Sequence, residues 1–306
     1  MRSQLEWVAP ASVAAGVTLV LLGSLVRVTG SGLGCPDWPL CHGGIVPPLE
    51  LPSIIEFIHR LGAAAVTVLV AAVVFLAWRH HRQDRWVLMP ALLAPVILCG
   101  QILLGAVTVK FELPPAVVGS HLGVALLLVA DLTAVTLGVH PAWGMPPRRG
   151  SGTARLSPLV GVVLVSLFVL LFLGATVVGT GSSLACPDWP LCYGALLPFT
   201  LGPQVAVQFL HRLSALLTFL LAILLFRETA GMYGQWPQPF FLAGTALALL
   251  VVQIVIGAGM VLFRLPLEWQ ALHVLLATTI WTLLAALEVM RLRWNPLVSI
   301  PEGAEA

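Results

Sequence analysis

The sequence predicts an all-α integral membrane protein whose eight transmembrane helices form two tandem four-helix bundles. Three observations carry this prediction. Hydrophobic residues make up 59% of the 306-residue chain and charged residues only 9%. Eight apolar stretches are each long enough to cross a bilayer. One heptapeptide, Cys-Pro-Asp-Trp-Pro-Leu-Cys, occurs twice, at residues 35–41 and 186–192, which indicates a tandem duplication.

The composition excludes several classes of protein. A soluble protein carries about a quarter charged residues, whereas this chain has 9% and a mean hydropathy of +1.00. A net charge of +2 gives no basic footprint for nucleic acid, so membrane lipids are the expected surroundings. The alternating pattern of barrel strands is absent, and helices are the other backbone that can cross a bilayer. We also expect no cleavable signal peptide, because no small-residue cleavage site follows the first apolar run.

The expected spans are about 20 residues long, the length that crosses the hydrocarbon core. They lie at residues 8–28, 54–78, 88–109, 116–139, 156–178, 205–226, 240–262 and 267–289.

Basic residues predict the orientation, because Lys and Arg concentrate in cytoplasmic loops. The loops at one end hold Arg2, Arg79, Arg82, Arg85, Arg148, Arg149, Arg155, Arg227, Arg291 and Arg293. The loops at the other end hold only Lys110 and Arg264. We therefore expect a protein of the cell membrane with both termini in the cytoplasm and both cysteine loops outside it.

An extracytoplasmic compartment is oxidising, so each cysteine pair is expected to close as a local disulfide, Cys35–Cys41 and Cys186–Cys192. A structural role is the default, and a redox-active pair is the alternative. Trp38 and Trp189 lie within these loops and are expected at the membrane interface, where tryptophan is enriched.

The duplication extends beyond the loops. Phe57-Ile-His-Arg-Leu61 matches residues 209–213, and Gln101-Ile-Leu-Leu-Gly105 matches residues 253–257, both at an offset of 152. Each unit holds an even number of helices, so the halves enter the membrane in the same sense, related by a pseudo-two-fold axis along its normal. The expected domains are residues 1–147 and 148–306, joined through a Pro-, Gly- and Arg-rich stretch at 141–155.

Four histidines, His59, His121, His211 and His273, fall in the even-numbered spans at similar depth. Buried ionisable residues are costly in lipid and usually functional. In an up-down bundle the second and fourth helices are parallel and can be diagonally opposite, so their imidazoles can ligate a flat tetrapyrrole from both sides. One such histidine alone could be a hydrogen-bonded core residue. Two repeated pairs favour haem, and no cluster of ligands favours zinc.

Glu56 breaks the repeat. It precedes His59 by three residues and so shares its helix face, whereas the counterpart before His211 is Gln208. An acid–base group beside only one site predicts a substrate site next to an electron-transfer site. The alternative is an ion pair between Glu56 and Arg60 near the membrane surface.

Three arginines are candidates for binding porphyrin propionates through forked hydrogen bonds: Arg27, Arg60 and Arg212. The alternative for these side chains is snorkelling to lipid headgroups. Gln101 and Gln253 are expected to form interhelical hydrogen bonds.

In combination these features resemble the haem A synthase family, over essentially the whole chain. The matching features are the eight spans in two halves, Glu-Phe-Ile-His at residues 56–59, His121, His211, His273 and the two outer Cys-X5-Cys loops.

The resemblance implies a role for each site residue. It implies that His211 and His273 hold a haem b cofactor and that His59 and His121 are associated with the substrate, haem O. It also implies that Glu56 is catalytic.

The resemblance further implies that the first cysteine pair is functionally important. Many members of the family lack the second pair, which this chain keeps at Cys186 and Cys192. The implied reaction oxidises the C8 methyl of haem O to a formyl group, with water as the oxygen source. Haem O synthase is an implied partner, whereas the sequence identifies no electron acceptor and leaves a homo-oligomer open.

Three other functions fit part of the pattern. A di-haem b-type electron-transfer protein would explain the four histidines but not the unrepeated Glu56. A transporter would need a polar path at mid-bilayer, whereas the ionisable residues gather near one surface. A thiol oxidoreductase centred on the cysteine loops would make the histidines incidental.

Overall fold

A computed structural model describes residues 4–140 and 155–294, and within these residues the fold is all-helical. The eight long helices are each long and apolar enough to cross a membrane, which confirms the predicted fold class. The helices are α1 Leu5–Val28, α2 Leu51–His80, α3 Arg85–Lys110, α4 Pro115–Val139, α5 Leu159–Gly179, α6 Pro203–Gly231, α7 Pro237–Leu262 and α8 Leu267–Trp294. A short 3-10 turn, η1, covers Phe199–Leu201.

Several helices extend beyond the spans expected from hydropathy. The helix α2 begins at Leu51 and ends at His80, so that it includes Arg79, and α6 continues past Arg227 to Gly231. The backbone can remain helical at basic residues near the end of a span, because their long side chains carry the charge to the membrane interface. The helix α5 instead begins three residues late, at Leu159, because Pro158 occupies its N-cap.

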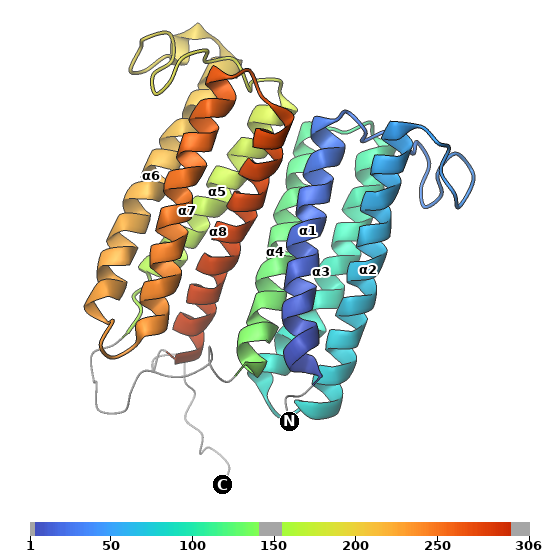
Figure 1. Cartoon of the computed structure of the whole chain (residues 1–306), viewed down its shortest axis with the longest axis vertical. Helices are drawn as coiled ribbons and strands as arrows, with labels where there is room; N and C mark the ends of the chain where they lie inside the picture. Colours follow the sequence, from blue (N-terminus) through green and yellow to red (C-terminus); the bar gives the residue numbers. More distant parts are fainter. Residues whose placement is uncertain (1–3, 141–154, 295–306) are drawn as a thin grey trace.

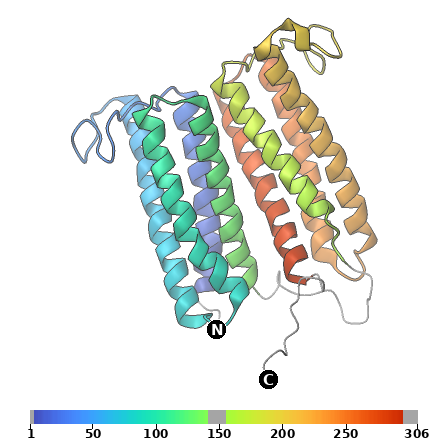
Figure 2. The ribbon, with the colours of Figure 1, turned by 180° about the vertical axis from the view of Figure 1, so that it is seen from behind.

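The helices pack in two rings of four. In the first, α1 contacts α2 and α4, and α3 contacts the same two helices, so α2 and α4 occupy opposite corners (Figures 1 and 2). In the second, α5 and α7 each contact α6 and α8, which again occupy opposite corners. The start of α1 and the end of α8 lie at one end, and the two cysteine loops at the other (Figure 1). The division into two domains and the pseudo-two-fold axis between them stay predictions. Residues 141–154 of the expected junction lie outside the described residues, and so does Arg2.

Helices α4 and α8 hold the two rings together. The indole Nε1 of Trp281 on α8 donates to the carbonyl oxygen of Leu126 on α4 at 2.7 Å. The ring of Trp281 also stacks at a tilt on Phe168 of α5, with centroids 5.6 Å apart. Gly123 of α4 leaves room for Phe168, since a Cβ there would lie 3.2 Å from the ring.

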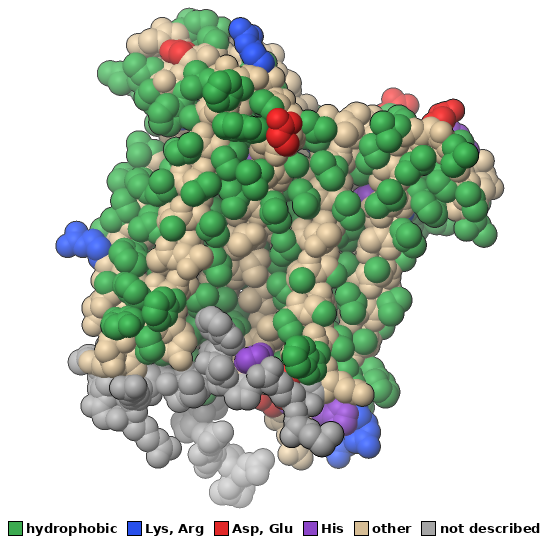
Figure 3. Space-filling model, in the orientation of Figure 1, with side chains coloured by type: hydrophobic (Ala, Val, Ile, Leu, Met, Phe, Trp, Pro, Cys, Tyr) green, Lys and Arg blue, Asp and Glu red, His purple; other side chains and the backbone are tan. Residues whose placement is uncertain are grey.

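The outward faces of the helices are apolar, as a lipid-exposed surface requires (Figure 3). Val68 and Phe75 on α2 and Val96 on α3 are among the exposed side chains. Beneath them, one large cluster of buried side chains fills the second ring and extends across the junction to Leu126, Val129 and Leu137 of α4, and two smaller clusters lie in the first ring.

The Trp281 contact gives a test of this arrangement. Trp281→Phe should lower the free energy of unfolding by about 0.5–1 kcal/mol, the usual value of one interhelical hydrogen bond, plus a packing loss. Thermal unfolding in detergent measures the change. The matched control is Trp78→Phe, because Trp78 is 59% exposed on the lipid face. Equal melting temperatures for both variants would contradict a structural role for the contact.

Candidate functional site

The four histidines of the repeat lie at matched depth on the four even-numbered helices. His59 and His211 follow the first residue of their helices by eight residues, and His121 and His273 by six. At 1.5 Å per residue these positions are about 12 and 9 Å from the helix starts. His59 and His121 lie on α2 and α4, at opposite corners of the first four-helix ring, and His211 and His273 lie on α6 and α8, at opposite corners of the second. The fold thus places the two histidines of each predicted pair on diagonally opposite helices, and their joint binding of one haem stays a prediction.

Each of these imidazoles packs against a glycine on the preceding helix. A Cβ on Gly23 would lie 3.1 Å from Cε1 of His59, and one on Gly174 would lie 3.1 Å from Cε1 of His211. The same relation holds between Gly105 and His121, at 3.1 Å, and between Gly257 and His273, at 3.2 Å. The glycines let the odd-numbered helices approach the imidazole rings closely, which keeps each imidazole inside its four-helix bundle.

One nitrogen of each imidazole ring is left without a hydrogen bond within the described ranges. Among the residues that the structure describes, the Nδ1 atoms of His59, His121, His211 and His273 are all buried and have no hydrogen-bond partner. Buried polar atoms without a partner are rare in native proteins, and each calls for an explanation such as a missing ligand. Imidazoles that each keep a buried nitrogen without a described partner, inside an apolar bundle, fit an iron tetrapyrrole, which takes axial nitrogen ligands and buries its faces in apolar side chains.

The two glutamines make different contacts at the two sites. Gln101 Nε2 lies 3.3 Å from Nε2 of His121, so it contacts the ring itself. Gln253 Nε2 donates to the backbone carbonyl of His273 at 2.9 Å. Both are interhelical hydrogen bonds, and both leave the amide Oε1 buried without a partner in the described part of the chain. The contact with the ring therefore distinguishes the first site from the second.

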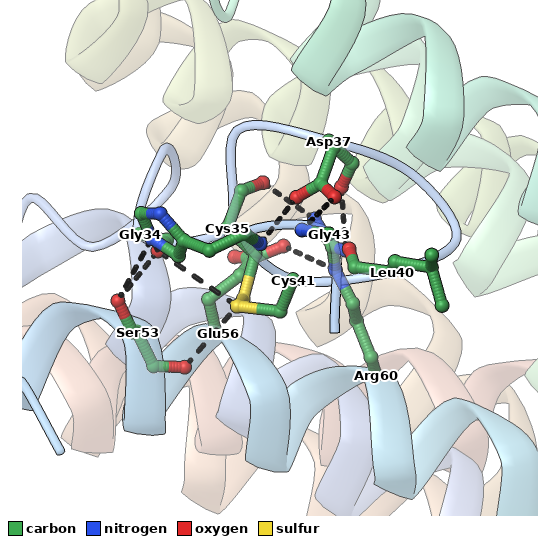
Figure 4. The surroundings of a disulfide bond; sticks show 10 residues. Gly34, Cys35, Asp37, Leu40, Cys41, Gly43, Ser53, Glu56 and Arg60 are labelled. Atoms are coloured by element: carbon green, nitrogen blue, oxygen red, sulfur yellow. Dashed lines mark hydrogen bonds and ion pairs between the residues drawn. A yellow bond between two sulfur atoms is a disulfide. The ribbon is translucent and has the colours of Figure 1, made fainter. Parts of the chain in front are cut away.

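The first cysteine loop is closed by the Cys35–Cys41 disulfide and held from below by Arg60 (Figure 4). Arg60 Nη1 donates to the carbonyls of Asp37, at 2.8 Å, and Leu40, at 2.7 Å, and Nη2 donates to that of Cys35 at 2.8 Å. One guanidinium thus connects the loop to α2, one residue after His59.

Glu56 completes this arrangement. Its Oε1 lies 3.1 Å from Arg60 Nε, so the ion pair considered as an alternative role is present. The residue is 5% exposed, and its second carboxylate oxygen has no hydrogen-bond partner among the described residues. Arg60 therefore contacts both the disulfide loop and the carboxylate, and leaves one carboxylate oxygen available for chemistry.

The second cysteine loop is closed by Cys186–Cys192 and held by Arg212 in the same way. Arg212 donates to the carbonyls of Asp188 at 2.8 Å and Cys186 at 3.1 Å, and also to that of Leu191. Gln208, the counterpart of Glu56, binds the loop directly by accepting from the backbone N–H of Cys186 and donating to Ser183 O. The amide thus has a structural role in this half.

These contacts change the expectations for the three arginines. Arg60 and Arg212 direct most of their donors to loop carbonyls, a role that sequence reasoning missed because it depends on the loop's three-dimensional path. Arg27 lies in the last turn of α1, is half-buried, and has no hydrogen bond or ion pair with any described residue. It is the arginine of the three whose guanidinium is free, and propionate binding by all three stays a prediction.

Asp37 and Asp188, also missed from the sequence, shape the loops. Asp37 accepts from the backbone N–H groups of His42 at 2.6 Å and Gly43 at 2.7 Å. The Gly43 and His42 N–H groups, with the charge of Arg60, hold the pKa of the Asp37 carboxyl below its usual range. Asp188 accepts in the same way from Tyr193 and Gly194, and its pKa is likewise lowered. The aspartate's place inside the repeated heptapeptide was the signal available in the sequence.

The glycine–histidine packing predicts the effect of a single methyl group. Gly257→Ala should displace the His273 ring by a few tenths of an ångström, since the new Cβ lies 3.2 Å from Cε1. We expect an altered electron paramagnetic resonance signal or a lower haem content in the purified protein. The control is Gly100→Ala, whose Cβ would meet nothing within 4 Å. Identical spectra for both variants and the wild type would contradict this packing role.

The Asp37 contact predicts a pH dependence. A lowered pKa in the folded loop means that the carboxylate stabilises the loop above the ordinary aspartate pKa of about 3.9. That stabilisation is lost as the pH falls through the lowered value. Reduction of Cys35–Cys41 by a phosphine should therefore accelerate at acid pH in the wild type and be fast throughout in Asp37→Asn. Glu50→Gln serves as the control, and a pH-independent rate in the wild type would contradict the prediction.

Comparison with known proteins agrees with this geometry. The chain is 30% identical to the heme A synthase of Bacillus cereus (strain G9842) over 304 residues. This alignment covers 96% of the chain and 95% of the relative. It is 29% identical over 303 residues to the heme A synthase of Bacillus anthracis (strain CDC 684 / NRRL 3495), with the same coverage. Residues 6–285 match the COX15-CtaA family, described as cytochrome oxidase assembly protein. Since this match takes in all four histidines and both cysteine loops, the chain belongs to the COX15-CtaA family.

Proposed function

We propose that this protein is a haem A synthase, an oxidoreductase that converts haem O to haem A for terminal oxidases. The relatives that share nearly its full length carry that name. The single observation that carries the proposal is a pair of imidazoles with buried Nδ1 atoms on diagonally opposite helices of each ring, with the buried carboxylate of Glu56 beside only one pair. The elements that a substrate site and a redox site require are thus present in one chain.

We assign the substrate, haem O, to the first pair, His59 and His121. Glu56 on the same face of α2 as His59 supports this assignment, because the other half has an amide, Gln208, that is fully engaged by its loop. Arg27 has no counterpart charge in the second half, where Val178 stands, and it can bind a propionate of the substrate.

We assign haem b to the second pair, His211 and His273. Haem b supplies one-electron redox chemistry when it is bound. The residues around it contribute packing and orientation. Gly174 and Gly257 hold the two rings in place, and no carboxylate of the described helices takes the position of Glu56. The electron acceptor beyond this site and a partnership with haem O synthase are open to experiment.

The proposed reaction is R–CH3 + H2O → R–CHO + 4 H⁺ + 4 e⁻, with water as the oxygen source. Each of its two stages removes two electrons and two protons, so a proton acceptor near the methyl group is required. The free carboxylate oxygen of Glu56 can take that proton, and its charge can stabilise positive charge that develops on the substrate. Arg60 holds the other oxygen at 3.1 Å and thereby fixes the carboxylate's direction.

We further propose that both cysteine loops are extracytoplasmic and both termini cytoplasmic. Lys and Arg support this orientation. Arg79, Arg82, Arg85, Arg291 and Arg293 lie at the end with the described termini. The described loops of the opposite end hold only Lys110, at the end of α3, and Arg264, and the other basic residues near that end are the helical Arg27, Arg60 and Arg212. The disulfides fit an oxidising compartment at that opposite end.

Glu56→Gln tests the catalytic assignment. The variant gives the first half the residue that the second half carries at this position, so it should fold and retain haem b. We expect conversion of haem O to fall by about 10²-fold or more, the usual range for loss of a general base. Extraction and chromatography of haems from cells supplied with haem O measure the product. A fully active Gln variant would remove Glu56 from the mechanism.

Exchange of the histidines tests the assignment of the two sites. His211→Ala should abolish the low-spin haem b signal of the purified protein, because one axial ligand is lost. His59→Ala should keep that signal and lose conversion. An unchanged spectrum in His211→Ala, or loss of haem b in His59→Ala, would overturn the assignment.

A further inference from the structure

The two cysteine loops end in exposed aliphatic tips that contribute nothing to the core. Ile45 and Val46 are 80% and 79% exposed, and Leu196 and Leu197 are 76% and 71% exposed. The two pairs are repeat equivalents at an offset of 151, and each directly precedes a proline. We propose that both tips insert into the nearest leaflet of the bilayer, so that the partner of this surface is lipid.

The composition of the tips fits a bilayer. Residues 43–49 and 194–202 contain no Asp, Glu, Lys or Arg. Further along the same segments, Leu49 is 94% exposed, and Phe199 and Leu201 are also exposed. In water such contiguous apolar surface is unfavourable, whereas transfer into a membrane releases the water that covers it. Exposed apolar surface at the equivalent position of both halves therefore indicates an apolar binding partner.

The position of the tips also points to lipid. The α1–α2 loop projects sideways beyond α2 and turns down along its outer end, and its surface is largely hydrophobic (Figures 1 and 3). The α5–α6 loop projects beyond α6 at the opposite edge of the molecule (Figure 1). In a membrane these edges face lipid, because the outward faces of the helices are apolar. Trp38 and Trp189, both about half exposed, lie in the same loops and suit the interface.

The base of each loop is rigid, so insertion needs little ordering. Cys41 and Gly44 exchange backbone hydrogen bonds of 2.9 and 3.1 Å directly before Ile45. The disulfide and the Arg60 contacts fix the other side of the same base. A preformed apolar tip on a fixed base loses little conformational freedom when it enters the membrane.

The arrangement at two opposite edges argues against a protein partner. One partner that covered Ile45 and Val46 would leave Leu196 and Leu197 in water at the other edge. The bilayer surrounds the molecule and reaches both tips at once. The inference rests on the transmembrane arrangement alone and not on the proposed reaction.

Spin labelling tests the proposal. Nitroxide labels are placed by Ile45→Cys or Leu197→Cys in a Cys99→Ser background, with both disulfides verified by mass spectrometry. The full chain is reconstituted in vesicles of phosphatidylcholine and phosphatidylglycerol. Oxygen concentrates in the bilayer and a nickel chelate in water, so the ratio of their collision rates with the label reports depth. We expect the ratio of the oxygen collision rate to the nickel collision rate to be several-fold higher at both tips than for a label in water.

Two reference positions calibrate the measurement. Val68→Cys marks the lipid-facing side of α2, and Glu112→Cys marks an exposed loop at the same end of the molecule. Tip ratios close to that of Val68→Cys support insertion. Ratios like that of Glu112→Cys would place the tips in water, and low collision rates with both reagents would show that protein covers them. Either of these results would overturn the proposal.

Discussion

The close contact between each site imidazole and a glycine of the neighbouring helix is the constraint on which the site depends. Helices in lipid gain no hydrophobic drive from one another, so they approach closely where small residues allow it. Gly23, Gly105, Gly174 and Gly257 provide this space on the four odd-numbered helices. The consequence is that four imidazoles lie at similar depth on the even-numbered helices, each with a buried Nδ1 that has no partner among the described residues.

Each cysteine loop is joined to the helix that carries a site histidine, and the same type of side chain makes this connection in both halves. Arg60 and Arg212 follow the site histidines directly and donate to loop carbonyls. The halves then diverge at one position. One carboxylate oxygen of Glu56 binds Arg60, whereas the amide of Gln208 accepts a hydrogen bond from Cys186 N–H and donates one to Ser183 O. A single exchange of carboxylate for amide thus distinguishes the two halves, and it is the basis on which we propose proton transfer at the first site and binding at the second.

Much of this was predictable from the sequence, because hydropathy and repetition are properties of the chain itself. The eight helices follow from apolar length, and the placement of the four histidines on diagonally opposite helices follows from their even-numbered spans. The Glu56–Arg60 pair was open to prediction as an alternative, since residues four apart share a helix face. The helix ends were less predictable, because α2 and α6 continue beyond the hydrocarbon-spanning residues.

The loop contacts were not predictable in the same way. The direction of Arg60 and Arg212 depends on where the loop carbonyls lie, which spacing along the chain does not specify. The glycines opposite the histidines are visible as repeats, Gly23 with Gly174 and Gly105 with Gly257, but their partners are on other helices. Asp37 and Asp188 act through backbone N–H groups five and six residues later, a pattern that only the folded loop creates.

The central claim is that the facing imidazoles hold iron tetrapyrroles inside the helical rings. X-ray diffraction at the iron absorption edge, from crystals of the protein purified from cells that make haem, tests it most directly. The account predicts an anomalous iron peak between the rings of His211 and His273. Iron at any other position, or crystals of coloured protein in which these two rings point away from each other into lipid, would contradict it.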